Sequence, residues 1–290
     1  MDCLKHLFVV GSGIGNQIQT IPAFMYLQEQ TEIDVVNCDG TNWEATCWLF
    51  KPLGAKVLRE VDVRDYQGQY LTLLCQRNPI DGISVISRDT VHFSDKHSEV
   101  RCNLWAVGTD DWTMPEGFLN CIPPMDTTTV LIHDGYARNT ALTPWEAKSW
   151  PGHLRASQRL REKGVSVGSI GGREEHVEGT EDFTGSSLRD TIARLKGTKV
   201  LLSNDSGMYH LACAVGTPCV VVFTFTSHIK NYDPNFHRLA SIIRRDLDCS
   251  PCQTKVFDPN DTWLKKRDVC KWACRDVPVD EVVSKVLERL

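Results

Sequence analysis

Short apolar runs alternate with segments of helical spacing along the whole chain. In the N-terminal half, apolar runs predict strands at residues 6–10, 32–36, 56–59, 70–75 and 83–86. Helical spacing predicts a helix that ends at residue 28 and another over residues 41–53. In the C-terminal half the same patterns predict strands at 129–133 and 165–170 and helices at 152–163, 187–196 and 279–290. Alternating strands and helices with short turns predict parallel sheets covered by helices on both faces.

Residues 199–224 carry the most informative pattern. A short apolar run ends in the polar turn 203–207, a segment with helical spacing follows, and a fully apolar strand occupies 220–223. Asp205 or Ser206 is placed to cap the helix, so the amides at the helix start face the crevice beyond the strand. Those N–H groups and the helix dipole favour anions, and His210, one turn into the helix, can add a donor. The pattern indicates a phosphate site, although His210 could also be a buried, hydrogen-bonded histidine.

Length and charge indicate two domains that differ in net charge. Its 290 residues suit two domains, and 41% hydrophobic with 24% charged residues is typical of a globular protein. Pro123 and Pro124 place the boundary near 122–128, which predicts domains over residues 1–126 and 127–290. Residues 1–130 have 9 basic against 17 acidic residues, and residues 131–290 have 23 against 20. An anionic ligand is therefore expected on the C-terminal half.

The start of the chain is interpreted directly as a first strand, because it has no long apolar region followed by a cleavage site. No apolar run approaches the roughly 20 residues of a membrane-spanning helix. We therefore expect a cytoplasmic protein without a membrane span.

Four segments of the C-terminal half recur together in one known family. They are VLIHDG (130–135), KSWP (148–151), GGREE (171–175) and NDSGMYHLA (204–212). In order and spacing they resemble glycosyltransferase family 9, which contains the lipopolysaccharide heptosyltransferases. The resemblance implies an α/β protein of the GT-B fold, with two Rossmann-like domains facing an interdomain cleft. Residues 127–290 would bind a nucleotide sugar and residues 1–126 the acceptor, in an N-terminal domain that is shorter than usual.

The resemblance also implies roles for single residues. Lys148 would hold donor phosphate oxygens, Glu174 or Glu175 would bind the ribose, and Asp205 would contact the donor sugar as a catalytic residue. The amides near Ser206 and Gly207, together with His210, would take the diphosphate. Charge develops on the leaving diphosphate, and fixed N–H donors with a lysine stabilise it. Such chemistry requires no cofactor, and no acidic pair in the sequence resembles a magnesium site.

Two of these assignments have simpler alternatives. Lys148 could be a solvated residue before a helix, and the two glutamates could be an acidic helix start that complements the helix dipole.

The loop after the first strand resembles the family's acceptor-side loop and departs from it at one position. Its residues of interest are Gly13, Gly15, Asn16, Gln17 and Thr20, with Asn16 and Gln17 expected as an exposed pair. Asn16 stands where the family has an aspartate thought to act as general base, and a neutral amide cannot remove a proton.

Three interpretations of Asn16 remain open. Another carboxylate supplies the base, with Asp110, Asp111 and Glu116 as candidates. Alternatively, the electrophilic sugar carbon needs little base assistance, or the protein binds a nucleotide sugar without transferring it. Under all three interpretations, Asn16 is expected in the catalytic site.

Four clustered cysteines mark the C-terminal region. Cys249, Cys252, Cys270 and Cys274 form two close pairs separated by 17 residues, a spacing that four thiolates around a structural zinc would fit. Disulfides and reduced thiols are the alternatives. Basic residues with Trp263 and Trp272 in the same region leave nucleic-acid binding as a lesser possibility, since five aspartates offset the charge.

The sequence therefore predicts a glycosyltransferase that uses a nucleotide-diphosphate sugar, inverts the anomeric centre and needs no metal for the chemical step. Direct displacement inverts configuration, and no residue suggests a retaining route. The acceptor is not identified and could be a glycan, a small molecule or a nucleic-acid base. Two alternatives are a non-catalytic nucleotide-sugar binding protein and a glycosyltransferase acting on nucleic-acid bases. Neither the base nor the sugar of the donor is selected by the sequence.

Overall fold

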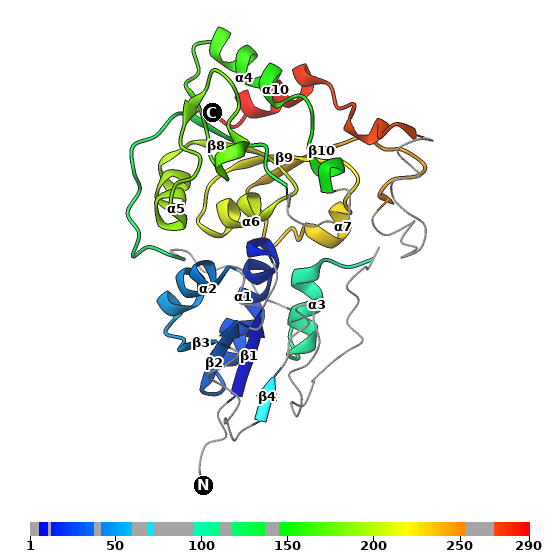
Figure 1. Ribbon diagram of the computed structural model, residues 1–290. Coiled ribbons are helices and arrows are strands. Elements are labelled where there is room, and N and C mark those ends of the chain that lie inside the picture. Colours follow the sequence, from blue (N-terminus) through cyan, green and yellow to red (C-terminus); the bar gives the residue numbers. More distant parts are fainter. Residues whose placement is uncertain are drawn as a thin grey trace.

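The computed structural model describes residues 6–10, 13–37, 42–59, 69–71, 96–110, 118–136, 145–252 and 270–290. These residues form two α/β units in chain order, each with its own parallel sheet (Figure 1). The predicted strand at 83–86 lies outside the described residues. No helix in the described part of the chain combines the length and apolar character needed for a membrane span.

The N-terminal sheet has the order β3-β2-β1-β4. Its strands are β1 (His6–Val10), β2 (Ile33–Asn37), β3 (Val57–Arg59) and β4 (Gln69–Leu71), and every pairing is parallel. Its helices are α1 (Ile14–Gln28), α2 (Trp43–Phe50) with the short η1 (Lys51–Leu53), and α3 (Glu99–Ala106). Phe8, Phe24 and Phe50 meet edge-on or tilted at the centre of this unit, so one strand and two helices share an aromatic core.

The C-terminal sheet has the order β10-β9-β8-β5-β6-β7, again parallel throughout. Its strands are β5 (Val130–His133), β6 (Val167–Ser169), β7 (Glu181–Asp182), β8 (Val200–Asn204), β9 (Cys219–Phe223) and β10 (Ala240–Arg244). Its helices are η3 (Trp145–Lys148), α4 (His153–Glu162), η4 (Arg173–Glu175), α5 (Leu188–Gly197), α6 (Gly207–Ala214), α7 (His228–Asn231), η5 (Ala273–Arg275) and α10 (Val279–Leu287). The predicted parallel sheet and its helices are confirmed.

Alternate side chains of each central strand cover opposite faces of this sheet. Val130 and Ile132 of β5 join the cluster beneath α4 and α10, whereas Leu131 between them joins the cluster with α5 and α6. Both faces of the sheet are therefore buried from solvent, which explains why these strands are continuous apolar runs in the sequence.

The two units are joined by a hydrophobic interface. One apolar cluster runs from Phe8 and Phe24 of the N-terminal unit to Tyr209 and Leu211 of α6. Helix α1 lies against α6, α2 against α5 and α3 against α7 (Figure 1). We call the line along which α1 meets α6 the interdomain seam. An interface of this apolar character holds the units in a defined arrangement.

The chain crosses between the units along α5. The Lys196 ammonium donates to the carbonyl oxygens of Leu119 and Ile122, at 3.1 and 2.6 Å, and the amide of Met125 donates to the carbonyl of Ala193. The segment before residue 126 is therefore attached to the C-terminal unit. The boundary at residues 126 and 127 stays a prediction.

Candidate functional site

The predicted site residues gather where the order of strands reverses. From β5 the chain adds β6 and β7 on one side and then returns to add β8, β9 and β10 on the other. The gap between the carboxyl ends of β5 and β8 is the usual ligand position in open parallel sheets. His133 ends β5, and Asp205 and Ser206 follow β8 directly.

Ser206 rather than Asp205 caps helix α6. Its hydroxyl oxygen accepts a hydrogen bond from the amide of Met208 at 3.3 Å, and its backbone is extended, as an N-cap requires. The described first turn of α6 contains no acidic residue. The positive end of the helix dipole is therefore not neutralised by the helix itself.

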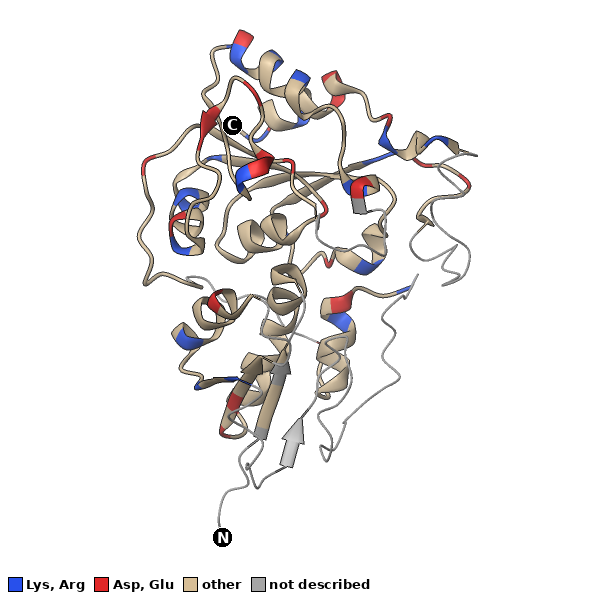
Figure 2. Ribbon diagram, in the orientation of Figure 1, with Lys and Arg blue, Asp and Glu red and all other residues tan. Residues whose placement is uncertain are grey.

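Helix α1 presents a second positive end to the same place. A Cβ added to Gly207 would lie 3.1 Å from the amide nitrogen of Gly15, so the two helix starts touch across the seam. Neither α1 nor α6 contains a Lys, Arg, Asp or Glu along its length, and both are tan in Figure 2. Two unneutralised helix N-termini in contact favour an anion between or beside them.

Lys148 and Asp205 form an ion pair beside the start of α6. The ammonium nitrogen lies 3.5 Å from Oδ2 of Asp205, whose side chain is 3% exposed. The same oxygen accepts a hydrogen bond from Nδ2 of Asn231 at 2.7 Å. The Asp205 carboxylate therefore sits between α6 and α7, and the partly exposed Lys148 lies above it.

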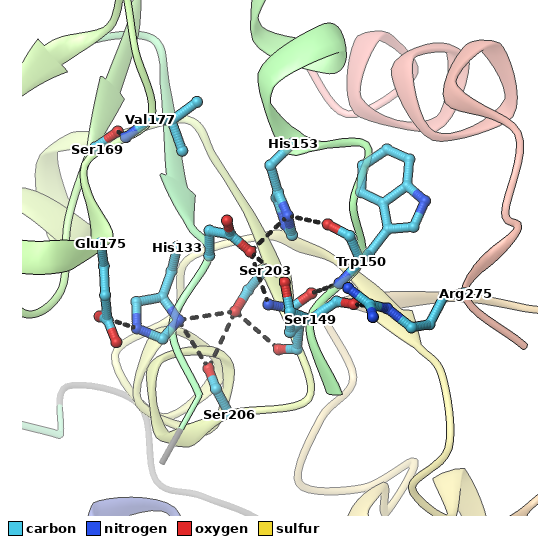
Figure 3. A network of polar contacts seen from close by, with 12 residues as sticks. His133, Ser149, Trp150, His153, Ser169, Glu175, Val177, Ser203, Ser206 and Arg275 are labelled. Atoms are coloured by element: carbon cyan, nitrogen blue, oxygen red, sulfur yellow. Dashed lines mark hydrogen bonds and ion pairs between the residues drawn. The ribbon is translucent and has the colours of Figure 1, made fainter. Parts of the chain in front are cut away.

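Buried contacts fix the segment that carries Lys148. The amide of Trp150 donates to Oδ1 of Asn204 at 2.9 Å, and Nε of Arg275 donates to the carbonyl of Ser149 at 2.7 Å (Figure 3). The Trp150 indole is almost fully buried and donates to the carbonyl of Val277. The sequence motif at 148–151 therefore anchors a lysine, and Lys148 is not merely a solvated residue before a helix.

Asp134 is a site residue that sequence reasoning did not single out. Its Oδ1 accepts from Ser149 Oγ at 2.9 Å and lies 3.0 Å from His153 Nδ1. Burial alone would raise the pKa of Asp134, but hydrogen bonds from His153, Ser149 and Asn204 outweigh it and lower the pKa. Its place in the motif at 130–135 was the available signal, and its role is to hold the lysine segment on the sheet.

The structure separates the two glutamates. Glu175 turns inward, with Oε2 3.3 Å from His133 Nε2 and 2.7 Å from the donating amide of Gly172 (Figure 3). Glu174 is exposed. A Cβ at Gly171, whose φ is +129°, would overlap the Glu175 carboxylate, so this glycine makes room for it.

His133 links the two sides of the site. Its Nδ1 lies 3.0 Å from Ser206 Oγ, while its Nε2 faces Glu175. Sequence reasoning quoted this histidine within a motif but gave it no role. It connects the glutamate after β6 with the cap of α6 after β8.

His210 is buried at the seam. It is 4% exposed, and its Nδ1 lies 2.8 Å from Nε2 of His237. Burial, followed by the nearby charges of His237, Lys148 and Lys230, lowers the pKa of His210 well below its ordinary value. A Cβ on Gly15 would come within 2.9 Å of its Cδ2, so the ring edge faces α1.

The acceptor-side loop is only partly as expected. Helix α1 begins at Ile14, so Gly15 and Asn16 belong to its first turn and Gly13 precedes it. The expectation of an exposed Asn16–Gln17 pair is wrong for Gln17, which is fully buried and accepts from Thr46 Oγ1 at 2.8 Å.

Thr20 is buried as well, and its hydroxyl donates to the carbonyl of Gln17. Both residues point into the N-terminal unit because the helix turns that face toward its core. Among the alternative bases, Asp110 is exposed, and Asp111 and Glu116 lie outside the described residues.

The four tail cysteines lie near one another. Burial raises the pKa of Cys274 to about 12, and the nearby Cys252, Cys270 and Cys249 add to that effect. All four are free cysteines. Within the described ranges, no group of three or more His, Cys, Asp or Glu side chains is placed to hold a metal ion. The loop at 253–269, with Trp263 and most of its basic residues, lies outside those ranges.

Comparison with known proteins finds one matching family model. Residues 138–261, which include Lys148, Glu175, Asp205 and His210, match the family model of glycosyltransferase family 9 (heptosyltransferase). The matched region covers less than half of the chain, and the match supports glycosyltransferase activity. A search of curated protein sequences finds no match.

Solved structures agree with this fold. The iron-containing dodecameric glycosyltransferase TibC from enterotoxigenic E. coli H10407 has 16% identity and a TM-score of 0.69, over 99% of this chain and 77% of its own. A family 9 glycosyl transferase from Veillonella parvula has 14% identity and a TM-score of 0.64, over 99% of this chain and 97% of its own. E. coli ADP-heptose lipopolysaccharide heptosyltransferase II has 14% identity and a TM-score of 0.59, over 98% and 99%. The chain thus has the GT-B arrangement of two Rossmann-like units that the sequence predicted.

Proposed function

We propose that this protein transfers a sugar from a nucleotide-diphosphate sugar to an acceptor hydroxyl, with inversion and without a metal at the chemical step. The observation that carries the proposal is the contact of two helix N-termini at Gly15 and Gly207, neither with an acidic residue in its first turn, with His210 and the Lys148–Asp205 ion pair beside them. A diphosphate supplies the negative charge that this arrangement favours.

Fixed donors at this position would act on the leaving group. As the bond to the sugar breaks, negative charge grows on the diphosphate, and the amides of α6 and the Lys148 ammonium are already in place to stabilise it. Asp205, which holds Lys148 by an ion pair, lies at the same helix start and would meet the donor sugar. Direct displacement by the acceptor inverts the anomeric carbon.

Glu175 is proposed as the ribose-binding residue, because it faces the site and Glu174 does not. The E. coli heptosyltransferase WaaC has been solved with ADP, and TibC with ADP-D-β-D-heptose. Adenine nucleotides and ADP-heptose are therefore the first donors to test. The acceptor is left open between a glycan, a small molecule and a nucleic-acid base.

Acceptor activation does not require Asn16 to act as a base. A carboxylate such as Asp110 could take the proton late in the reaction, or the electrophilic sugar carbon could need little assistance. We place Gly13, Gly15 and Asn16 on the acceptor side of the seam, since α1 begins there. Gln17 and Thr20 are not part of that surface, because both are buried.

A thermal-shift titration tests donor binding. ADP, UDP, GDP and their sugar conjugates are added to the purified protein, and a ligand at 100 times its Kd should add about 2.7 kcal/mol of stability. Glu175→Gln should weaken binding of a nucleoside diphosphate about tenfold, since a hydrogen bond to a charged group contributes about 1.5–3 kcal/mol.

Glu174→Gln is the matched control for this titration, because the neighbouring glutamate is exposed and should leave binding unchanged. Folded wild-type protein that responds to no nucleotide would remove the basis of the donor site.

The four tail cysteines are proposed to hold a structural metal. Cys249, Cys252 and Cys270 lie near Cys274, and although the four described side chains are not arranged around a common point, four thiolates suit tetrahedral zinc or iron. TibC, described as iron-containing, makes iron a second candidate beside zinc. The metal would join Cys249 and Cys252 to Cys270 and Cys274, and no reaction step depends on it.

Elemental analysis tests the metal. Purified protein should contain about one equivalent of zinc or iron, which Cys270→Ser should abolish. Cys121→Ser is the control, because Cys121 is an exposed free cysteine outside the cluster. Metal-free wild-type protein of unchanged stability would contradict the proposal.

A further inference from the structure

We propose that His237 is a positioning residue that fixes His210 in the tautomer with its proton on Nε2. His210 then presents an N–H donor to the donor diphosphate at the interdomain seam. The inference rests on the proposed function and adds a residue outside the four sequence motifs. It starts from two hydrogen-bond distances around His237.

The proton of His237 is located by a backbone amide. The amide nitrogen of Asp233 donates to Nδ1 of His237 at 2.9 Å. The carbonyl oxygen of Asp233 lies farther from the same nitrogen, at 3.2 Å. Because a backbone amide always carries its hydrogen, a proton on Nδ1 would meet that hydrogen across 2.9 Å, so the shorter contact places a lone pair on Nδ1. Burial lowers the pKa of His237 to about 3, so the ring is neutral at physiological pH. Its one proton therefore lies on Nε2.

The proton of His210 follows from that of His237. Nε2 of His237 and Nδ1 of His210 are 2.8 Å apart, and the His237 nitrogen carries the hydrogen. Nδ1 of His210 must then accept. Since burial beside His237, Lys148 and Lys230 keeps His210 neutral, its own proton lies on Nε2. A chain of two hydrogen bonds thus sets the tautomer.

The protonated edge of His210 faces the seam. Its Cδ2, the atom bonded to Nε2, would be 2.9 Å from a Cβ on Gly15. Among the described residues, the hydrogen bond of the His210 ring is made by Nδ1 and not by this Nε2. Nε2, which is bonded to this Cδ2, therefore lies near the place where the starts of α1 and α6 meet.

The N-terminal unit holds the loop that carries His237. Oδ2 of Asp233 accepts from Ser98 Oγ at 2.7 Å and lies 3.8 Å from Nε of Arg101, both at the start of α3. The other carboxylate oxygen accepts from the amide of Asn235 at 3.0 Å. The amide that orients His237 is thus fixed by docking of the two units, which would link the docked arrangement to donor binding.

Nitrogen-15 NMR of the histidine rings tests the tautomer directly. Wild-type His210 and His237 should both show protonated Nε2 and unprotonated Nδ1 between about pH 6 and 8. His237→Gln keeps an N–H donor toward His210 and should preserve its tautomer. His237→Phe keeps a ring but removes the donor, and should lower affinity for a nucleoside diphosphate about tenfold, as expected for one hydrogen bond to a charged group.

Recovery of affinity in His237→Gln relative to His237→Phe separates positioning from packing. His228→Phe is the control and should bind normally. His228 is a half-buried histidine of α7 that does not take part in the two hydrogen bonds that set the tautomer. Nδ1 protonation of His210 in the wild type would overturn the inference, as would unchanged affinity in folded His237→Phe. The NMR result on the wild type and His237→Gln decides the tautomer even if His237→Phe does not fold. Wild-type protein that binds no nucleotide would overturn the donor role of His210 together with the proposed function, although the tautomer would still be measured.

Discussion

Lys148→Ala should lower the turnover number about 10²–10³-fold, because it removes one fixed donor from the charge that grows on the leaving diphosphate. The fold should be retained with some loss of stability, because the buried Asp205 carboxylate loses its countercharge. The lysine is 18% exposed, and Asp205 keeps its hydrogen bond from Asn231. Initial rates with saturating donor and acceptor measure the loss, and circular dichroism melting checks the fold.

Lys163→Ala is the control for this variant, because Lys163 is exposed at the end of α4 and lies outside the site. It should retain the wild-type rate. A turnover within threefold of wild type in Lys148→Ala would mean that Lys148 does not stabilise the transition state. Reduced donor affinity with an unchanged turnover would assign Lys148 to ground-state binding alone.

Lys230→Met should destabilise the protein by about 3–5 kcal/mol, because it leaves the partner carboxylate buried without a countercharge. The Lys230 ammonium lies 2.6 Å from Oε2 of Glu99, and both side chains are under 10% exposed. Glu99 belongs to α3 and Lys230 to α7, so the pair also joins the two units. Urea denaturation of the variant and wild type measures the difference.

Two comparisons distinguish a buried pair from a surface pair. The double variant Lys230→Met/Glu99→Leu should recover much of the lost stability, since no unpaired charge remains. Lys285→Met removes one partner of an exposed pair with Glu288 on α10 and should cost less than about 1 kcal/mol. If Lys230→Met were as mild as Lys285→Met, the interdomain ion pair would not contribute to stability.

Much of the fold was readable from local patterns. Strand β1 and helix α1 end at the predicted residues, and the strand, helix and strand over 199–224 are confirmed. Apolar runs and helical spacing predict these elements because a strand or helix must bury a repeating set of side chains. Asp205, Ser206 and His210 drew notice in the sequence because they follow the end of β8 within a few residues, and Lys148 because it belongs to the motif at 148–151.

Helix α3 shows where local patterns fail. Ser98 caps it and Glu99 begins it, which is a normal helix start, but no clear apolar face follows. Its first residues bury polar groups: Glu99 meets Lys230, and Ser98 meets Asp233, each more than 130 residues away. A polar residue that is buried by a distant partner looks exposed in sequence.

The sequence by itself determined the order of strands and helices, the position of the helix start after β8 and the resemblance to a family. Tertiary structure decided that Glu175 rather than Glu174 faces the site and that Gln17 is buried. It also decided that Asp134 contacts the segment carrying Lys148 and that His237 contacts His210. The reason is physical. Periodicity and capping arise between residues within a few positions, whereas side-chain direction, burial and proton position depend on neighbours supplied by other strands and by the other domain.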